Sequence, residues 1–365
     1  MNPLRHSGDN KVPTANKGKN SHPHVSEQAK KPPEQRLPLY RAVITGYGSF
    51  APAKILTNDD LSDMVDTSDE WITTRTGIKR RHITTDDETT AYLATEAAKR
   101  ALQQAHVDPG ELDMIIVATI TPEMVFPSTA CFVQRALHAE KAWVFDLGAA
   151  CSGFIYGLSI VQQFIESGRH KKALVIGAET LTKITNWKDR SSCVLFGDGA
   201  GAVVLEAAED GRRGILYSTL SADGEQWEAL NCQAYGSRHP SHEQLDDPDK
   251  IYMEIYGRQV YQQAVRRIVE SVTDCMEHCK LTVDDIAMVI SHQMNQRIIE
   301  SAAKRLNLPD EKVYINITEY GNTSAASVPI AFDGCVREGK IKRGDIIIFV
   351  AFGAGLTWGA NVIEF

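Results

Sequence analysis

The sequence lacks any apolar run long enough to cross a membrane. A bilayer-spanning helix needs about 18–20 consecutive apolar residues, whereas the longest run here, within Asp345–Phe352, is much shorter and predicts a buried strand. The beginning of the chain also lacks the apolar segment of a secretory signal, and it is poor in the arginine and aliphatic residues of a transit peptide. With 43% hydrophobic and 24% charged residues among 365, the composition is that of a globular protein, which we expect to be cytoplasmic.

Cysteine is sparse, and its pattern argues against two common uses. Seven scattered cysteines without a secretory signal predict reduced thiols rather than a disulfide framework. Cys275 and Cys279 share a helix face, but no second pair of ligands follows at the spacing of a zinc site. The sequence therefore predicts no metal centre.

Positive charge is concentrated at the beginning of an otherwise acidic chain. The formal net charge is −8, but residues 1–38 carry seven basic and three acidic residues, which gives +4 and leaves −12 for the remainder. An acidic body disfavours bulk nucleic-acid binding, although it leaves room for a local basic patch. Residues 1–38 also have few large apolar side chains, so we predict a disordered polar tail that is inert rather than a docking arm.

From Leu39 onward, strand and helix patterns alternate. Strands are predicted at 40–48, 113–119, 143–146, 173–177, 200–206, 286–291, 313–315 and 345–351. Helices are predicted at 90–104, 128–137, 153–167, 252–278 and 296–306. This alternation predicts an α/β fold with mostly parallel sheets.

The chain also repeats itself at nearly one offset. The similar segments are 112–116 and 286–290 (offset 174), 148–151 and 321–324 (offset 173), and 173–176 and 346–349 (offset 173). Such collinear matches predict two similar halves, 39–212 and 213–365, produced by a duplication. Ligands tend to bind between two such halves, so we expect the functional site there.

Cys151 is the strongest candidate for a nucleophile. It follows a predicted strand and a turn of small residues, Gly148–Ala150, and it stands where a helix begins. A helix N-terminus lowers the pKa of a thiol and favours the nucleophilic thiolate. The alternative is a buried, inert cysteine, which is a common role for this residue.

Two turns of the second half supply possible partners for Cys151. His292 follows a predicted strand and precedes a helix, and Asn322 lies on the duplicate of the Cys151 turn. Either side chain is also compatible with a purely structural role as a cap or a satisfied core group.

Two glycine-rich segments lie near these residues in the predicted fold. Phe352–Gly359 keeps the backbone thin after the last long strand, so that an N–H group can point at a reacting carbonyl. Phe196–Ala202 lacks the Lys-Ser/Thr pair of a phosphate-binding loop and precedes a strand, so we interpret it as close backbone packing near the site.

Together, these motifs resemble the β-ketoacyl-acyl carrier protein synthase III family of the thiolase superfamily. The likeness extends over nearly all of 39–365, and its blocks are 69–78, 149–153, 196–201, 292–295, 321–329 and 352–359. The resemblance implies a duplicated thiolase-like fold, with two similar halves and mixed sheets in a layered α-β-α-β-α arrangement. It also implies a homodimer, in which an exposed strand after Cys131–Asp146 pairs two sheets, and a reaction without metal or other cofactor.

The resemblance also implies the site residues. The catalytic triad would be Cys151, His292 and Asn322, with the oxyanion held by the N–H groups of Cys151 and Ala354. The implied substrates are an acyl-CoA, with acetyl-CoA favoured, and malonyl-acyl carrier protein, which condense with loss of carbon dioxide to start fatty-acid synthesis. The implied ligand contacts are Trp71, Arg75, Arg190, Gly257 and Asn295 for CoA, Arg297, Lys304 and Arg305 for the carrier protein, and Phe126 for the partner subunit's acyl pocket.

Some positions depart from the family pattern. Ala354 replaces a common glycine, Arg258 and Gln262 are unusual at the tunnel and carrier face, and the stretch 231–250 is longer than in most relatives. The longer stretch leaves primer choice open. The alternatives are therefore a paralogue that condenses other or longer acyl groups for a specialised metabolite, and a non-catalytic carrier-binding subunit, which the intact triad disfavours.

Overall fold

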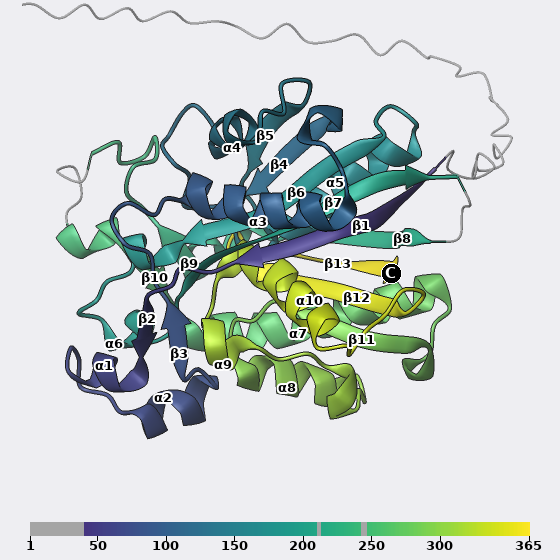
Figure 1. Ribbon diagram of the computed structural model, residues 1–365. Coiled ribbons are helices and arrows are strands. Elements are labelled where there is room, and N and C mark those ends of the chain that lie inside the picture. The colour runs from purple at the N-terminus through teal and green to yellow at the C-terminus, as the bar shows by residue number, and fades with distance from the viewer. Residues whose placement is uncertain (1–39, 210–212, 242–246) are drawn as a thin grey trace, which may run out of the picture. The chain divides into compact units, whose positions relative to one another are not determined.

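Two mixed β-sheets form the centre of the fold (Figure 1). The computed structural model describes residues 40–365 except 210–212 and 242–246, so the tail predicted at 1–38 lies outside the described residues. The first sheet has the order β1 (Arg41–Phe50), β7 (Asp198–Ala208), β6 (Lys172–Thr180), β4 (Met114–Ala118) and β5 (Trp143–Leu147). The second has the order β8 (Gly214–Ala222), β13 (Thr357–Glu364), β12 (Ile346–Gly353) and β11 (Ile286–Ser291).

Strand pairing within each sheet is part parallel and part antiparallel. β4 runs parallel to β5 and β6, and β11 runs parallel to β12. The pairs β1–β7, β6–β7, β12–β13 and β13–β8 are antiparallel. The prediction of mostly parallel sheets was therefore wrong, because β13 returns beside β12 through a tight hairpin that the alternation of strands and helices does not reveal. The mixed sheets implied by the resemblance are confirmed.

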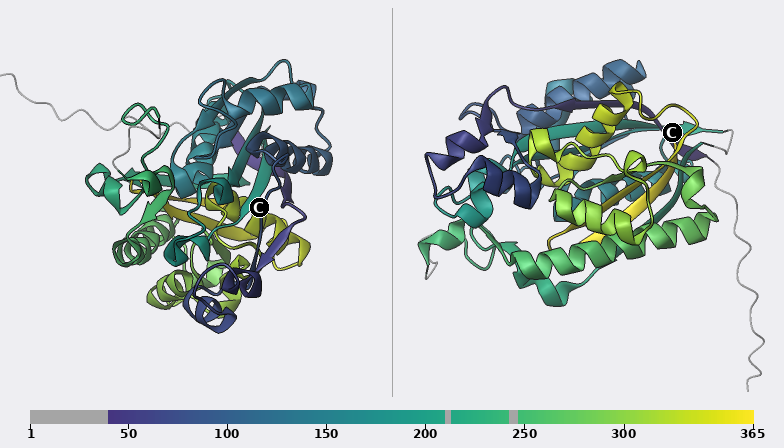
Figure 2. Two further views of the ribbon diagram at one scale, coloured as in Figure 1. Left: turned by 90° about the vertical axis from the view of Figure 1, so that its left-hand side faces the viewer. Right: turned by 90° about the horizontal axis from the view of Figure 1, so that it is seen from below.

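Helices cover both sheets and fill the space between them, which gives five layers (Figures 1 and 2). The outer layers are α3 (Thr90–Ala105) with α4 (Thr129–Leu137) on the first sheet, and α7 (Gly257–Cys279) with α8 (Gln296–Arg305) on the second. The central layer is α5 (Gly153–Glu166) with α10 (Ser327–Arg337), which pack against both sheets. Within the described ranges, no helix has both the length and the apolar character needed to cross a bilayer.

Short elements surround these layers. The helices are α1 (Asn58–Ser62), α2 (Asp69–Thr76), α6 (Arg190–Cys193) and α9 (Ile317–Tyr320). The strands are β2 (Ile55–Thr57) with β3 (Arg80–His82), and β9 (Leu230–Cys232) with β10 (Met253–Ile255). Turns of 3₁₀ helix lie at Pro109–Glu111, Ala150–Ser152, Leu181–Ile184, Gly224–Ala229, Pro248–Ile251, Val283–Asp285, Asp310–Lys312 and Ser324–Ala326.

The two sheets share one strand order, with β8-β13-β12-β11 corresponding to β1-β7-β6-β4. The turns before α5 and α10 also match, since Ala150 (φ 45°) and Ser324 (φ 48°) both adopt the left-handed conformation that non-glycine residues rarely use. These residues are 174 positions apart, so the offset of 173 predicted for this turn was wrong by one residue. Cys151 therefore corresponds to Ala325 rather than to Ser324.

Several predicted elements differ in extent. Residues 313–315, predicted as a strand, make a single parallel bridge between Val313 and Val289, where a fifth strand of the second sheet would lie. The helix predicted from 252 begins at Gly257, because β10 takes up Met253–Ile255. The strands β8 and β13 were not predicted.

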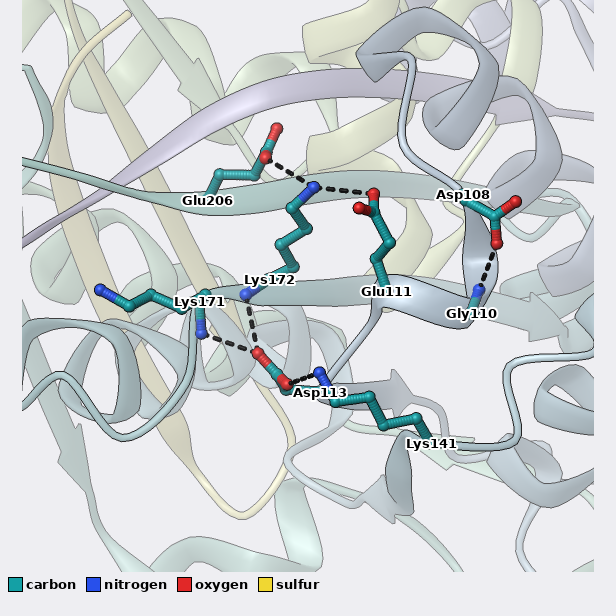
Figure 3. A network of polar contacts seen from close by, with 8 residues as sticks. All are labelled: Asp108, Gly110, Glu111, Asp113, Lys141, Lys171, Lys172 and Glu206. Atoms are coloured by element: carbon teal, nitrogen blue, oxygen red, sulfur yellow. Dashed lines mark hydrogen bonds and ion pairs between the residues drawn. The ribbon is translucent and has the colours of Figure 1, made fainter.

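A network of charges joins the ends of four strands in the first sheet (Figure 3). The Asp113 carboxylate, just before β4, accepts hydrogen bonds from the Lys171 and Lys172 N–H groups at 2.8 and 3.1 Å, and it pairs with the Lys141 ammonium at 2.6 Å. The Lys172 ammonium lies 2.8 Å from the Glu111 carboxylate and 3.4 Å from that of Glu206. Because β4, β5 and β6 all start here, the network fixes their register at the end opposite to the Cys151 turn.

Candidate active site

The Cys151 turn is held from both sides. It connects β5 to α5, and a 3₁₀ turn at Ala150–Ser152 precedes the helix. The Ser152 hydroxyl donates to the Thr357 carbonyl at 3.0 Å, and the Thr357 hydroxyl donates to the Ala149 carbonyl at 3.0 Å. Gly353 ends β12 directly against the turn, since a Cβ atom there would lie only 2.7 Å from the Cys151 nitrogen. Strands of the second sheet therefore position the nucleophile candidate of the first half.

The reverse contact is made by the first sheet. A Cβ atom on Gly177, in β6, would lie 2.2 Å from the Ala325 carbonyl oxygen in the turn before α10. Glycine is required there because no side chain fits between the strand and the turn. The turn that carries Asn322 thus packs against the first sheet, just as the Cys151 turn packs against the second.

The Cys151 thiol is almost fully enclosed, with 7% of the residue exposed. Burial raises the pKa of Cys151 to about 12, because the thiolate loses its hydration. The N-terminus of α5 acts in the opposite direction, but in the free protein burial outweighs it, contrary to the lowered pKa predicted from the sequence. The resting group is therefore a thiol, and its proton must be accepted when the nucleophile forms.

His292 follows β11 and is neutral. Its N–H donates to the Val350 carbonyl at 2.8 Å, and its Nδ1 lies 2.6 Å from the Ser327 hydroxyl oxygen. That oxygen also accepts the Gln293 N–H at 3.3 Å. This arrangement favours the tautomer in which the Ser327 hydroxyl donates to Nδ1 and the ring proton is on Nε2. Burial lowers the pKa of His292 to about 3, because the imidazolium would lose its hydration.

Asn322 is held by its backbone and by its side-chain oxygen. Its N–H donates to the Leu195 carbonyl at 2.8 Å, and its carbonyl accepts the Gly197 N–H at 3.0 Å. The side-chain Oδ1 accepts the Ser324 N–H at 2.9 Å. With the oxygen engaged in this way, the donor end of the amide is the part of the side chain left for a ligand. The close approach of Gly197 to this turn confirms the packing role predicted for Phe196–Ala202.

One cavity of about 720 Å³ brings the three candidates together. Cys151, His292, Asn322 and the predicted oxyanion residue Ala354 all line it. Much of the remaining wall is apolar and includes Ile120, Met124, Val125, Leu181, Ile184, Leu195, Phe196, Leu230, Met253, Ile255, Val260, Ile298 and Phe352. Residues 230–236 contribute part of this wall, so the beginning of the stretch 231–250, which the resemblance predicts to be longer than in most relatives, borders the cavity.

Gly257 and Asn295 also line the cavity, and Asn295 connects it to an aromatic stack outside. The Asn295 amide nitrogen donates to the Arg75 carbonyl at 3.1 Å. The guanidinium groups of Arg75 and Arg190 lie 4.8 and 4.9 Å from the centre of the Trp71 ring. Among the residues that the structure describes, Trp71 and its two arginines form a separate cluster that does not line the cavity.

The other predicted residues are exposed. Arg297, Lys304 and Arg305 lie on the surface of α8, where the Arg297 Nε also donates to the Thr74 carbonyl at 2.9 Å. Phe126 has 82% of its surface exposed, and within the described ranges it does not line the cavity of its own chain. Its neighbour Val125 is 81% exposed, so this loop presents an apolar surface to its surroundings.

Sequence reasoning missed several polar groups at the site. Ser327 belongs to the 321–329 block. Its contact with His292 joins two distant segments, so the spacing of residues in the sequence does not predict it. Glu179 is the residue before the last in β6, and the signal that could have revealed it is a carboxyl within an otherwise apolar strand. Across the described residues, no group of three or more His, Cys, Asp or Glu side chains is arranged to hold a metal ion.

The chain is similar to known condensing enzymes over most of its length. Residues 145–224 match the family described as 3-oxoacyl-[acyl-carrier-protein (ACP)] synthase III, and 276–365 match its C-terminal part. The β-ketoacyl-[acyl-carrier-protein] synthase III of Caldanaerobacter subterraneus subsp. tengcongensis is 58% identical over 88% of this chain and 97% of its own.

Solved structures agree with this relationship. The 3-oxoacyl-[acyl-carrier-protein] synthase III of Aquifex aeolicus has a TM-score of 0.82 and 49% identity, over 89% of this chain and 100% of the other. The priming β-ketosynthase of the R1128 polyketide pathway has a TM-score of 0.83 and 35% identity, over 91% and 98%. The fold and the site thus define a thiolase-like acyltransferase. The chain belongs to the β-ketoacyl-[acyl-carrier-protein] synthase III family.

Proposed function

We propose that Cys151 carries an acyl group taken from acyl-CoA and that the enzyme condenses this group with malonyl-acyl carrier protein. The observation that carries the proposal is the convergence of Cys151, His292 and Asn322, from three separate turns that precede helices, on one largely apolar cavity. A buried nucleophile with two neutral polar partners suits acyl transfer through a covalent thioester. The overall reaction is a decarboxylating Claisen condensation.

In the first step, Cys151 attacks the thioester carbon and CoA leaves as a thiolate, which is then protonated. The oxyanion that forms would be stabilised by the N–H groups of Cys151 and Ala354. The close packing of Gly353 against the Cys151 turn supports this pairing, because it brings the backbone at 353–354 beside the nucleophile. Ala354 serves as well as glycine, since the donor is a backbone group.

In the second step, malonyl-acyl carrier protein loses carbon dioxide, and negative charge develops on its thioester oxygen. The Nε2–H of neutral His292 and the amide of Asn322 would donate hydrogen bonds to that oxygen. The low pKa of His292 supports this role, because the ring keeps a single proton on the side away from Ser327. The resulting carbanion attacks the acyl group on Cys151 and releases the β-ketoacyl thioester.

Coenzyme A would lie between the Trp71 stack and the cavity. The Trp71 ring, with Arg75 and Arg190 beside it, suits a purine and its phosphates. Gly257 and Asn295 would border the pantetheine arm as it enters.

The carrier protein would dock on the exposed basic residues of α8, which are Arg297, Lys304 and Arg305. An acidic carrier is attracted to this face, although the body of the enzyme is acidic overall. Such a patch guides encounter more than it adds affinity.

We further infer a homodimer built on two halves, 39–212 and 213–365. The shared strand order of the two sheets supports the duplication. Support for the dimer comes from the edge strand β5, whose Trp143 is 40% exposed, and from the exposed Phe126 loop, which would enter the partner subunit's acyl pocket.

Acetyl-CoA is the proposed primer, which places the enzyme at the start of fatty-acid synthesis. A primer for a specialised metabolite is the second candidate. Two observations favour it. Residues 230–236 form part of the cavity wall, and the chain is similar to a priming β-ketosynthase of a polyketide pathway.

An acyl-CoA panel followed by intact mass measurement tests the proposal. We expect wild type and Cys232→Ser, whose thiol borders the same cavity, to gain an acyl mass, and Cys151→Ser to gain none. His292→Ala and Asn322→Ala should still load, but their decarboxylation of malonyl-acyl carrier protein should fall by about 10²–10³. Failure of every short acyl-CoA to load the wild type would contradict fatty-acid initiation, and equal loss of loading in both alanine variants would contradict the assigned roles.

A further inference from the structure

A buried carboxyl lies beside the site without a role in the reaction described above. Glu179 stands at the carboxyl end of β6 and is 0% exposed. Its oxygens accept hydrogen bonds from the Thr121 hydroxyl at 2.7 Å, the Thr119 hydroxyl at 3.2 Å and the Ile120 N–H at 3.1 Å. These donors follow β4 and leave part of the carboxyl's accepting capacity for another partner.

The Ser324 hydroxyl interacts with both this carboxyl and the nucleophile. It is buried, yet it makes no hydrogen bond of standard geometry with any described residue. A buried hydroxyl without a settled partner is destabilising, and such groups often have a functional reason.

The backbone keeps this hydroxyl in place. Ser324 adopts φ 48°, a left-handed conformation that is strained for a residue with a side chain. The Asn322 side-chain oxygen accepts its N–H at 2.9 Å, which ties the strained turn to the site.

The acylation step needs a proton acceptor that the triad does not supply. Burial lowers the pKa of His292 to about 3, so the ring does not hold a second proton near neutrality. Burial raises the pKa of Glu179 to about 7, which lets this carboxyl exchange a proton there. Its neighbours on the segment after β4 and on the Ser324 turn are neutral hydroxyl and N–H groups, and Cys151 is the titratable side chain that faces it.

We propose that Glu179 accepts the Cys151 proton through the Ser324 hydroxyl during acylation and returns it after condensation. The proposal rests on the proposed function, and it names the proton store of the same site. Glu179 exchanges the proton with Cys151 through Ser324 and does not touch the substrate. Its role is therefore indirect: it stores the proton, and it is not a catalytic residue in contact with the reacting atoms.

The proton balance closes over the cycle. During acylation the S–H proton passes to Ser324, whose own proton passes to the Glu179 carboxylate, while the Sγ–acyl bond forms and the acyl–CoA bond breaks. The CoA thiolate that leaves takes a proton from water. In condensation, the enolate carbon bonds to the acyl carbon and the Sγ–acyl bond breaks. The Cys151 thiolate then regains its proton from Glu179 by the reverse path.

The proton held on Glu179 also favours binding of the second substrate, malonyl-acyl carrier protein. While the acyl group is on Cys151, Glu179 is uncharged, so the malonyl carboxylate enters a cavity without a buried negative charge nearby. Like charges in a poorly solvated site repel strongly, and neutral Glu179 removes that cost at the stage when the anion binds.

The test is the pH dependence of single-turnover loading of Cys151 from acetyl-CoA, followed by quenching and intact mass between pH 5.5 and 9. In the wild type we expect the rate to rise with pH and to bend near pH 7, as the Glu179 carboxylate forms. Glu179→Gln, which keeps shape and hydrogen bonding, should lose this bend and load about 100-fold more slowly at pH 7.5. The acetyl-CoA concentration at half-maximal rate should stay within about threefold, because ground-state binding is unchanged.

Two further variants separate the relay from a general effect of removing a buried acid. Ser324→Ala should reproduce the slow loading, because it breaks the path but keeps the carboxyl. Asp198→Asn is the matched control: Asp198 lies on the adjacent strand β7, is 0% exposed and accepts hydrogen bonds from Thr84 and Thr182. It should retain the bend near pH 7 and a loading rate within about threefold of wild type.

Each outcome decides the matter. An unchanged bend and rate in Ser324→Ala overturns the relay, even if Glu179→Gln does not fold. Equal slowing in Asp198→Asn also overturns it, because a buried acid would then matter only for packing. A wild type that never forms acyl-Cys151 contradicts the proposed function itself, whereas normal wild-type loading with unaffected variants contradicts only the relay.

Discussion

Replacing Gly353 by alanine offers a direct test of how tightly the second sheet positions Cys151. The added Cβ would lie 2.7 Å from the Cys151 nitrogen and 3.1 Å from its Cβ. Ordinary carbon contacts are about 3.5–4.0 Å, so the turn or the strand must move by nearly 1 Å. Both are backbone, and they are held by the Ser152 and Thr357 hydrogen bonds on the other side.

The structural cost of this change is modest and the catalytic cost is large. Overpacking of this kind costs about 1–3 kcal/mol. For the folded unit Pro38–Phe365, an unfolding entropy of about 0.7 kcal/mol per kelvin converts that cost into a fall in Tm of roughly 1.5–4.5 °C. A displacement near 1 Å at a reacting group can cost about 100-fold in rate, so loading of Cys151 should fall by 10- to 100-fold.

Single-turnover loading and thermal unfolding, measured on the same samples, check both numbers. Gly148→Ala is the matched control, because Gly148 is the first residue of the same turn and a Cβ there meets no described atom within 4 Å. We expect Gly148→Ala to load within about threefold of wild type. If Gly353→Ala loads at the wild-type rate, or if both variants lose the same amount of loading rate, the idea that contact with β12 fixes the position of Cys151 would be refuted.

Two further predictions concern the nucleotide stack and the buried imidazole. Trp71→Ala should raise the KM for acyl-CoA by about 10-fold, since stacking on a base contributes about 1–3 kcal/mol, and an equal rise with acyl-pantetheine, which lacks the nucleotide, would contradict the assignment. His292 has a folded-state pKa of about 3 against an unfolded value of about 6.5, so below pH 6.5 the unfolded chain binds a proton that the folded chain does not. Its contribution to stability is therefore complete above pH 6.5 and falls by up to about 1.4 kcal/mol per pH unit toward pH 3. Urea unfolding of wild type and His292→Gln at pH 7 and pH 5 should show about 2 kcal/mol less loss in the variant, and parallel losses would contradict the neutral state.

The sequence was most informative where one local rule decides the structure. The strand, small-residue turn and helix start around Cys151 come from local patterns, and the structure has all three. His292 likewise follows a strand and precedes a helix, whereas Asn322 follows the short helix α9 instead of the strand predicted at 313–315. The cavity brings both residues together with Cys151. Motif order added the family, which the comparisons confirm.

Other features depend on contacts that no local pattern records. The hairpin of β12 and β13 and the long strand β8 were missed, because strand direction is decided by pairing with distant segments. The repeat was misaligned by one residue at the Cys151 turn, since similarity of small residues cannot detect that Ala150 and Ser324 share one backbone conformation. The thiol pKa was mispredicted for a related reason, because the depth of burial outweighs the helix N-terminus and is not visible in the sequence.

The reciprocal packing of the two turns also bears on how such an enzyme can arise. Gly353 of the second sheet supports the turn of Cys151, and Gly177 of the first sheet supports the turn that follows Asn322. Each half therefore shapes the reactive group of the other and holds only part of the machinery. Under the proposed duplication, an ancestor made of a single half would have been active only as a pair of identical chains. On this proposal, joining the halves freed each of them to specialise, one in holding the acyl group and the other in handling the malonyl thioester.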